Sequence, residues 1–78
     1  MPIVLRVKGY RFGFYASDAD EPPHVQVRKN GKHAKFWLSP KVELEFNRRF
    51  RPHEINEIAK LIVSRRTELL ENWNGFFG

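Results

Sequence analysis

The sequence has no cysteine and no long hydrophobic run, and both absences narrow the class of protein. Without thiols the chain can form neither a disulfide nor a thiolate metal site, and this composition suits a reducing compartment. No apolar stretch approaches the roughly 20 residues that a membrane-spanning helix needs. The start of the chain reaches a charge at Arg6, too soon for a signal peptide. We therefore expect a cytoplasmic protein with no membrane segment.

Acidic residues are also scarce, because 9 Asp and Glu stand against 14 Lys and Arg, giving a formal net charge of +5. Residues 1–53 hold 11 basic and 5 acidic side chains (+6), whereas residues 54–78 hold 3 and 4 (−1). The positive electrostatic potential of this part of the chain would attract anionic partners, which are nucleic acids or acidic proteins. The alternative is that these charges serve solubility alone.

The segment 22–38 has the pattern of a β-hairpin. Asn30-Gly31 separates two alternating runs and favours a type I′ turn, which needs a positive φ at both central positions. The register that follows is Lys29–Lys32, Arg28–His33, Val27–Ala34, Gln26–Lys35, Val25–Phe36 and His24–Trp37. Because alternate side chains point to opposite faces, one face should pack in the core. Its members are Val25, Val27, Ala34, Phe36 and Leu38.

The opposite face of this hairpin is cationic, polar and aromatic, and it is the best functional candidate in the sequence. Its members are His24, Gln26, Arg28, His33, Lys35 and Trp37. In a ribonuclease, His24 and His33 would be the acid and base. Arg28 and Lys35 would hold a phosphate. The Gln26 amide would donate a hydrogen bond, and the Trp37 indole would stack on a base.

Residues 3–15 predict an earlier hairpin that turns at Lys8-Gly9, since its runs are rich in β-prone aromatic and branched residues. Its register would be Ile3–Phe14, Leu5–Phe12 and Arg6–Arg11. Facing arginines repel at a cost of roughly 0.2–1 kcal/mol, which an anionic partner or a nearby glutamate would offset. Arg6 and Arg11 are therefore candidate binding residues, with two solvated arginines as the alternative.

The loop between the hairpins carries Asp18, Asp20 and Glu21, whose oxygens are ligands that hard cations prefer. Their spacing lacks the rest of a calcium-loop pattern, so we interpret the run as a solvated turn. We expect no metal site and no cofactor.

The last third of the chain predicts one more strand and a helix. Residues 41–47 alternate, with Val42, Leu44 and Phe46 on one face. Pro52 suits a first helical position, and apolar residues then recur at helical spacing to about Asn74. This stripe is formed by Ile55, Ile58, Ala59, Ile62, Leu69 and Trp73.

These segments predict a single α+β domain over residues 1–78. An antiparallel sheet of four to five strands begins with the two hairpins, and one long C-terminal helix covers its apolar face. Arg66 lies at the edge of the helical stripe, so we expect its stem to pack and its charged group to remain in water.

Three segments together resemble a small prokaryotic family, domain-of-unknown-function family 4160. They are Met-Pro-Ile-Val-Leu-Arg-Val, then Pro-Pro-His-Val-Gln-Val with Ala-Lys-Phe-Trp-Leu, and finally Asn-Trp-Asn-Gly-Phe-Phe-Gly. Members of this family resemble components of two-gene toxin–antitoxin modules, often beside a second small protein of unknown-function family 2442. The resemblance implies a toxin-like protein with a small antitoxin-like partner, and we expect a homodimer or a hetero-oligomer.

The chain departs from the family pattern at two positions. Gln26 stands where the family motif has a second histidine, so a His-x-His metal site or acid–base pair on this strand is lost. Arg51 stands where the family tends to have a serine-type helix cap, which costs on the order of 1 kcal/mol of helix stability.

Three hypotheses for function follow. The first is a toxin that binds RNA and cleaves it without a metal. The second is a non-catalytic module whose basic face docks nucleic acid or an acidic protein, which demands charge and shape but no tuned proton transfer. The third is structural: Trp37 covers the sheet, and His24 hydrogen-bonds to the acidic loop.

Overall fold

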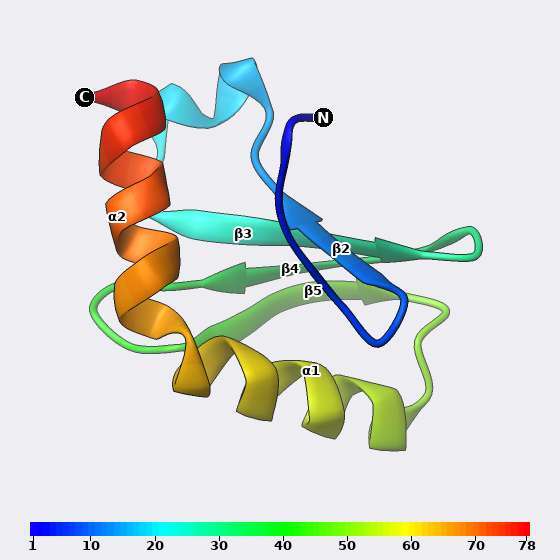
Figure 1. Cartoon of the computed structure of the whole chain (residues 1–78). Coiled ribbons are helices and arrows are strands. Elements are labelled where there is room, and N and C mark those ends of the chain that lie inside the picture. Colours follow the sequence, from blue (N-terminus) through cyan, green and yellow to red (C-terminus); the bar gives the residue numbers. More distant parts are fainter.

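The computed structural model describes all 78 residues as five strands, one 3-10 turn and two α-helices (Figure 1). In chain order they are β1 (Ile3–Val7), β2 (Tyr10–Gly13), η1 (Ala16–Asp20), β3 (His24–Lys29), β4 (Lys32–Trp37), β5 (Glu43–Arg48), α1 (Pro52–Ser64) and α2 (Arg66–Phe77). This arrangement confirms the predicted α+β class. Neither helix has the length and apolar character to cross a membrane.

The sheet is an antiparallel meander in the order β1-β2-β3-β4-β5, so every strand pairs with its neighbours in the chain. The helices pack on its apolar face, because their buried residues belong to the same core cluster as those of the strands. Figure 1 shows α1 running along the sheet and α2 turning away at one end. The opposite face, called the outer face below, carries the polar side chains. The helices reach it at one end, where Trp73 meets His24.

Both predicted hairpins form. Lys8 and Gly9 have φ values of 53° and 83°, and Asn30 and Gly31 have φ values of 48° and 78°. These left-handed conformations are those that a type I′ turn requires. All six predicted pairs of the second hairpin are present. Its apolar face is buried as predicted, with at most 2 % exposure, at Val25, Val27, Ala34, Phe36 and Leu38.

The first hairpin follows the predicted register except at its start. Two predicted pairs form, Leu5–Phe12 and Arg6–Arg11. The third prediction is wrong, because the register shifts between Ile3 and Leu5 and places Ile3 opposite Gly13 instead of Phe14. A Cβ at Gly13 would lie 2.1 Å from the Pro2 carbonyl oxygen, so the close passage of the N-terminal backbone depends on glycine here.

A second irregularity changes the face of Phe46. The register of β4 and β5 shifts between Lys35 and Phe36, so that Phe46 pairs with Lys35 while Leu44 pairs with Phe36. The predicted alternation of residues 41–47 would have kept both on the apolar face. Instead the bulge sends the Phe46 ring to the outer face, because one extra residue inverts the side to which a strand points.

The predicted single helix is wrong, because the helical segment breaks at Arg65 into α1 and α2. Arg65 has φ −118° and ψ 18°, outside helical geometry, and the Ser64 hydroxyl donates to the Leu61 carbonyl. Such side-chain bonds to the preceding turn favour a bend. The break redirects the chain, and α2 then buries Leu69 and Trp73. It also runs past the predicted end near Asn74, to Phe77.

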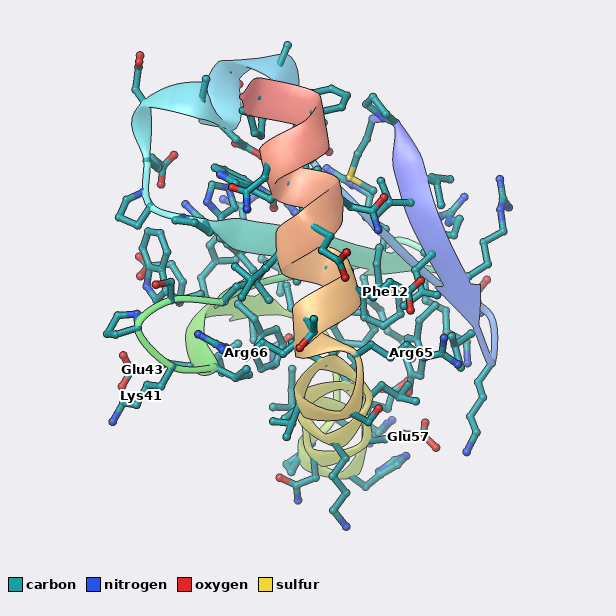
Figure 2. All side chains as sticks on the ribbon, turned by 60° about the vertical axis from the view of Figure 1, so that its left-hand side comes forward. Phe12, Lys41, Glu43, Glu57, Arg65 and Arg66 are labelled. Carbon is teal, nitrogen blue, oxygen red and sulfur yellow. The ribbon has the colours of Figure 1, made fainter.

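Arg66 follows the break, and its half-exposed side chain also donates to two backbone carbonyls, which the sequence did not predict. Its Nε donates to the Leu38 carbonyl at 2.7 Å, and its Nη2 donates to the Pro40 carbonyl at 3.3 Å. Figure 2 shows Arg66 extending toward the connection between β4 and β5, which contains Lys41 and leads to Glu43 at the start of β5. Hydrogen bonds from a charged donor contribute about 1.5–3 kcal/mol, so this contact fixes the start of α2 against the sheet.

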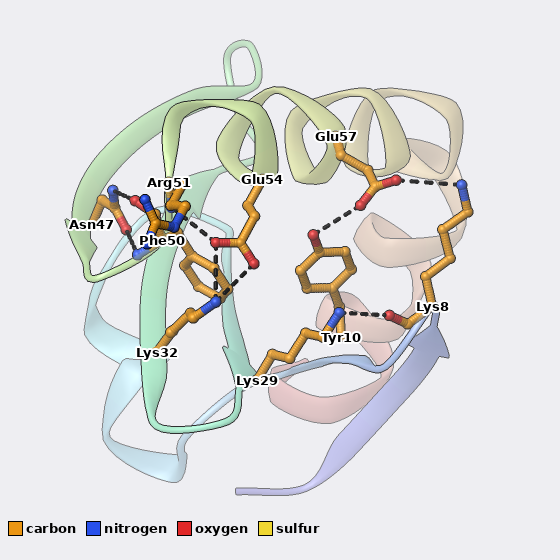
Figure 3. Close-up of polar contacts among 9 residues, drawn as sticks. All are labelled: Lys8, Tyr10, Lys29, Lys32, Asn47, Phe50, Arg51, Glu54 and Glu57. Atoms are coloured by element: carbon orange, nitrogen blue, oxygen red, sulfur yellow. Dashed lines mark hydrogen bonds and ion pairs between the residues drawn. The ribbon is translucent and has the colours of Figure 1, made fainter.

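Two glutamates of α1 tie the helix to the hairpin turns (Figure 3). Glu54 accepts from Lys32 Nζ at 3.0 Å and from the Arg51 backbone amide at 2.9 Å. The latter bond is the half of a capping box that the N3 residue supplies, and Arg51 adds no side-chain cap of its own. Glu57 accepts from the Tyr10 hydroxyl at 2.8 Å and from Lys8 Nζ at 3.4 Å. His53, in the first turn of α1, is exposed.

Candidate nucleic-acid interface

The strand register aligns five basic residues side by side across the outer face. The pairs are Arg6–Arg11, Arg11–Arg28, Arg28–His33 and His33–Arg48, so the line crosses all five strands. We call Arg6, Arg11, Arg28, His33 and Arg48 the cationic row. Strands lie about 4.8 Å apart, so the row is roughly 19 Å long.

The arginines of the row have no acidic partners. Every ion pair in the structure involves other basic residues. Arg6, Arg11 and Arg48 are exposed. Arg28 is half-buried, and its Nε donates to the Tyr15 hydroxyl at 2.8 Å. Near the β1–β2 turn, a hollow of about 330 Å³ is lined in part by Arg6 and Arg11. The row therefore presents unneutralised charge to solvent.

His33 lies within the row as a neutral imidazole. Burial lowers the pKa of His33 below its ordinary 6.5, and the charges of Arg28 and Arg48 lower this pKa further. Its Nε2 donates to Gln26 Oε1 at 2.7 Å, and its ring meets the Phe46 ring edge to face at 5.0 Å. Nδ1 is therefore the nitrogen that keeps a free lone pair.

His24 lies in a different environment from His33. It is fully buried, and its ring contacts Trp37 and Trp73 at centroid distances of 5.5 and 5.0 Å. The hairpin register places it four strand residues from the Arg28–His33 pair, roughly 13 Å along the sheet. An acid and a base for one phosphate must both reach it within hydrogen-bond distance. The structure does not bring the two predicted catalytic histidines together.

The other predicted site residues lie between these two histidines. Gln26 and Lys35 face each other but are 6 % and 9 % exposed. Lys35 Nζ contacts Glu21 and lies 4.7 Å from the Trp37 ring centroid. The Trp37 indole donates to Glu45 Oε2 at 2.7 Å. These residues are therefore largely engaged within the protein.

Three residues of the outer face were not among the predicted site residues. Arg48 extends the row onto β5, and its guanidinium lies 5.6 Å from the Phe46 ring centroid. Phe46 reaches this face through the bulge, which the alternation of residues 41–47 does not reveal. Tyr15 follows β2 and touches Arg28. The clustering of Arg48 and Arg49 after the predicted strand was the one sequence signal for this end of the row.

The structure defines a small α+β domain with a cationic outer sheet face. The family model for a domain of unknown function, DUF4160, matches residues 9–74, and the chain belongs to this family. This match confirms the family expected from the sequence motifs. No curated protein and no solved structure matches the chain.

Proposed function

We propose that this protein binds single-stranded RNA through the cationic row, as the toxin-like member of a toxin–antitoxin pair in the cytoplasm. The observation that supports binding most directly is the row itself. Four arginines without acidic partners line up with His33 across the sheet. Phosphate groups bound to these guanidinium groups would release counterions, which is the main source of affinity for a nucleic acid.

The cost of the row within the folded protein supports an anionic ligand. Directly facing like charges destabilise a sheet by roughly 0.2–1 kcal/mol per pair. Arg11 faces an arginine on each side, Arg6 and Arg28. A phosphate chain lying over the row removes this repulsion and forms charge-assisted hydrogen bonds with the guanidinium groups.

Aromatic rings beside the row favour a single strand over a duplex. Phe46 and Tyr15 are half-buried and contact Arg48 and Arg28, respectively. Unpaired bases stack on such rings, with a contribution of about 1–3 kcal/mol per base, whereas the bases of a duplex are already stacked.

The arrangement of the histidines favours binding over cleavage. His24 is buried beside two indoles, and His33 stands alone in the row as a neutral imidazole. Holding RNA needs charge and shape alone, and the row supplies both. We therefore propose that the protein acts on RNA by binding it and not by hydrolysing it.

The same surface accounts for the partner in this proposal. A small antitoxin-like protein that carries acidic side chains would pair with the arginines and exclude RNA. The two ligands would then compete for one face, so that neutralising the row weakens both.

The test compares two double variants in fluorescence-anisotropy titrations with a labelled single-stranded RNA. One is Arg11→Ala/Arg48→Ala, and its charge-matched control is Lys60→Ala/Arg65→Ala, on α1 and at the break between the two helices. Each lowers the formal net charge from +5 to +3. We expect at least tenfold weaker binding for the row variant and little change for the control, with circular dichroism verifying that both fold.

Salt dependence gives a second readout of the same experiment. Each phosphate contact on a single strand contributes about −0.7 to the slope of log affinity against log salt, so four arginines give at most about −2.8 and the row variant about −1.4. Equal affinities and slopes for the two variants would contradict the proposal. Shortening of the RNA during incubation with wild-type protein would contradict the non-catalytic form.

A further inference from the structure

Three side chains from the loop between the two hairpins and the start of β3 converge on one point: Asp18, Glu21 and His24. Their ligand-type atoms lie within 4.8 Å of one another. We propose that these residues form a binding site for a divalent first-row cation of the Zn²⁺ type. The site is separate from the cationic row and does not depend on the proposed RNA binding.

The orientation of the His24 ring carries the inference. Its Nδ1 lies 2.9 Å from the Pro22 carbonyl oxygen, which can only accept, so Nδ1 carries the proton and Nε2 keeps its lone pair. Histidines that bind metals commonly donate their other ring N–H to a backbone carbonyl in this way. The tautomer is therefore the one that a metal ligand needs.

His24 Nε2 is buried and has no hydrogen-bond partner. The nearest carboxylate oxygen, Asp18 Oδ2, is 3.1 Å away but lies off the line of a hydrogen bond. A buried polar atom without a partner destabilises the folded protein. A cation between the two atoms would give Nε2 the partner that it lacks.

The spacing of these two atoms fits a shared cation. Tetrahedral bonds of about 2.0–2.2 Å place neighbouring ligand atoms roughly 3.3–3.6 Å apart, close to the 3.1 Å observed. Asp18 is itself held in place, because Oδ2 accepts from the Tyr15 backbone amide at 2.8 Å within the η1 turn. The His24 ring is locked by the two indoles that contact it.

Glu21 gives the site its third ligand and its opening to solvent. Its side chain is 40 % exposed, so a rotation can bring it to the cation and water can occupy a fourth position. Lys35 pairs with Glu21 and leaves the site with a net charge of −1, from two carboxylates and one ammonium group. A divalent cation would reverse this charge to +1. Imidazole and carboxylate together suit Zn²⁺ better than Ca²⁺ or Mg²⁺.

Isothermal titration of the full chain with Zn²⁺ and visible absorption with Co²⁺ test the site. We expect one cation per chain, and a Co²⁺ spectrum that differs from that of the aqueous ion. Asp18→Asn and Glu21→Gln should each weaken binding at least tenfold, and Asp20→Asn, a neighbouring carboxylate outside the cluster, should change it by less than twofold. These variants keep side-chain size, and Asp18→Asn retains an oxygen acceptor for the Tyr15 amide.

The imidazole gives an independent readout. In ¹H–¹⁵N spectra of the histidine rings, Zn²⁺ should shift His24 Nε2 and leave His53 unchanged. The proposal is overturned if wild-type protein binds neither cation, or if Asp18→Asn and Glu21→Gln bind as tightly as wild type. It is also overturned if the ring that responds is His33 or His53.

Discussion

The Tyr10 hydroxyl donates a 2.8 Å hydrogen bond to Glu57 Oε1, and this contact joins β2 to α1. Burial, followed by the bond and by the negative charge of Glu57, raises the pKa of Tyr10 from 10.0 to about 12. The same bond is the main reason that the pKa of Glu57 lies below its ordinary value. Both shifts favour the pair as it is seen, with a protonated phenol and an ionised carboxylate.

The first prediction concerns alkaline pH. A pKa raised by folding contributes stability below the unfolded-state value, and this contribution is lost as pH rises through the folded-state value. Wild-type protein should therefore lose stability between about pH 10 and 12, as measured by urea unfolding. Tyr10→Phe should be less stable at neutral pH and should lack this loss. Tyr15→Phe, which keeps Tyr10, should retain it.

The second prediction concerns acid. The backbone amide of Arg51, and then Lys32, lower the pKa of Glu54 below its ordinary 4.5. A lowered carboxyl pKa contributes stability above the unfolded-state value, and this is lost as pH falls through the folded-state value. Urea midpoints should thus fall below pH 4.5, and less steeply in Glu54→Gln than in wild type. Glu71→Gln, an exposed change on α2, serves as the control, and a midpoint curve for Glu54→Gln parallel to wild type would contradict the argument.

The third prediction concerns His33 and its surroundings. The groups that face it are Arg28, Arg48, Gln26 and the Phe46 ring. NMR titration should give a His33 pKa below 6.5, and Arg48→Ala should recover part of the shift, because burial is the larger cause. Bound RNA should raise this pKa, since phosphate favours the charged ring. Affinity should then rise as pH falls below about 6.5, but not in His33→Asn.

The fourth prediction compares two glycines. Gly13→Ala places a Cβ 2.1 Å from the Pro2 carbonyl oxygen, so the first hairpin must shift, and we expect a loss of about 1–3 kcal/mol in unfolding free energy. Gly75→Ala meets nothing within 4 Å and lies inside α2, where alanine is favoured by up to about 1 kcal/mol. Thermal unfolding should therefore move in opposite directions for the two variants.

Local chemistry made much of the fold predictable. Asn30-Gly31 and Lys8-Gly9 specify two turns, and period-2 alternation then sets which side chains face the core. Long-range fit explains the misses. The bulge in β5 follows from how that strand meets β4, and the break at Arg65 gives α2 the direction that buries Leu69 and Trp73. The Ser64 hydroxyl is a local contribution to the break, but it does not determine the direction of α2, and the residues of β5 do not reveal the bulge.

The candidate site was predictable in part for the same reason. The hairpin register correctly placed Arg28 beside His33, and the first hairpin paired Arg6 with Arg11. Joining these pairs into one row required the register between β2 and β3, which the long connection between these strands leaves open. The burial of His24 could not be predicted from the sequence either, because Trp73 is distant in the chain and packs on it only in the tertiary fold.

The strand order β1-β2-β3-β4-β5 has a kinetic consequence. Each strand finds its partner one turn or one connection away, so no sheet pairing has to wait for a distant segment. Chains dominated by local pairing close small loops and fold rapidly compared with other β-rich topologies. The contacts between residues far apart in the sequence form when α1 and α2, the last elements of the chain, pack on the sheet and complete the core. The sheet can therefore begin to assemble before the helices that stabilise it are in place.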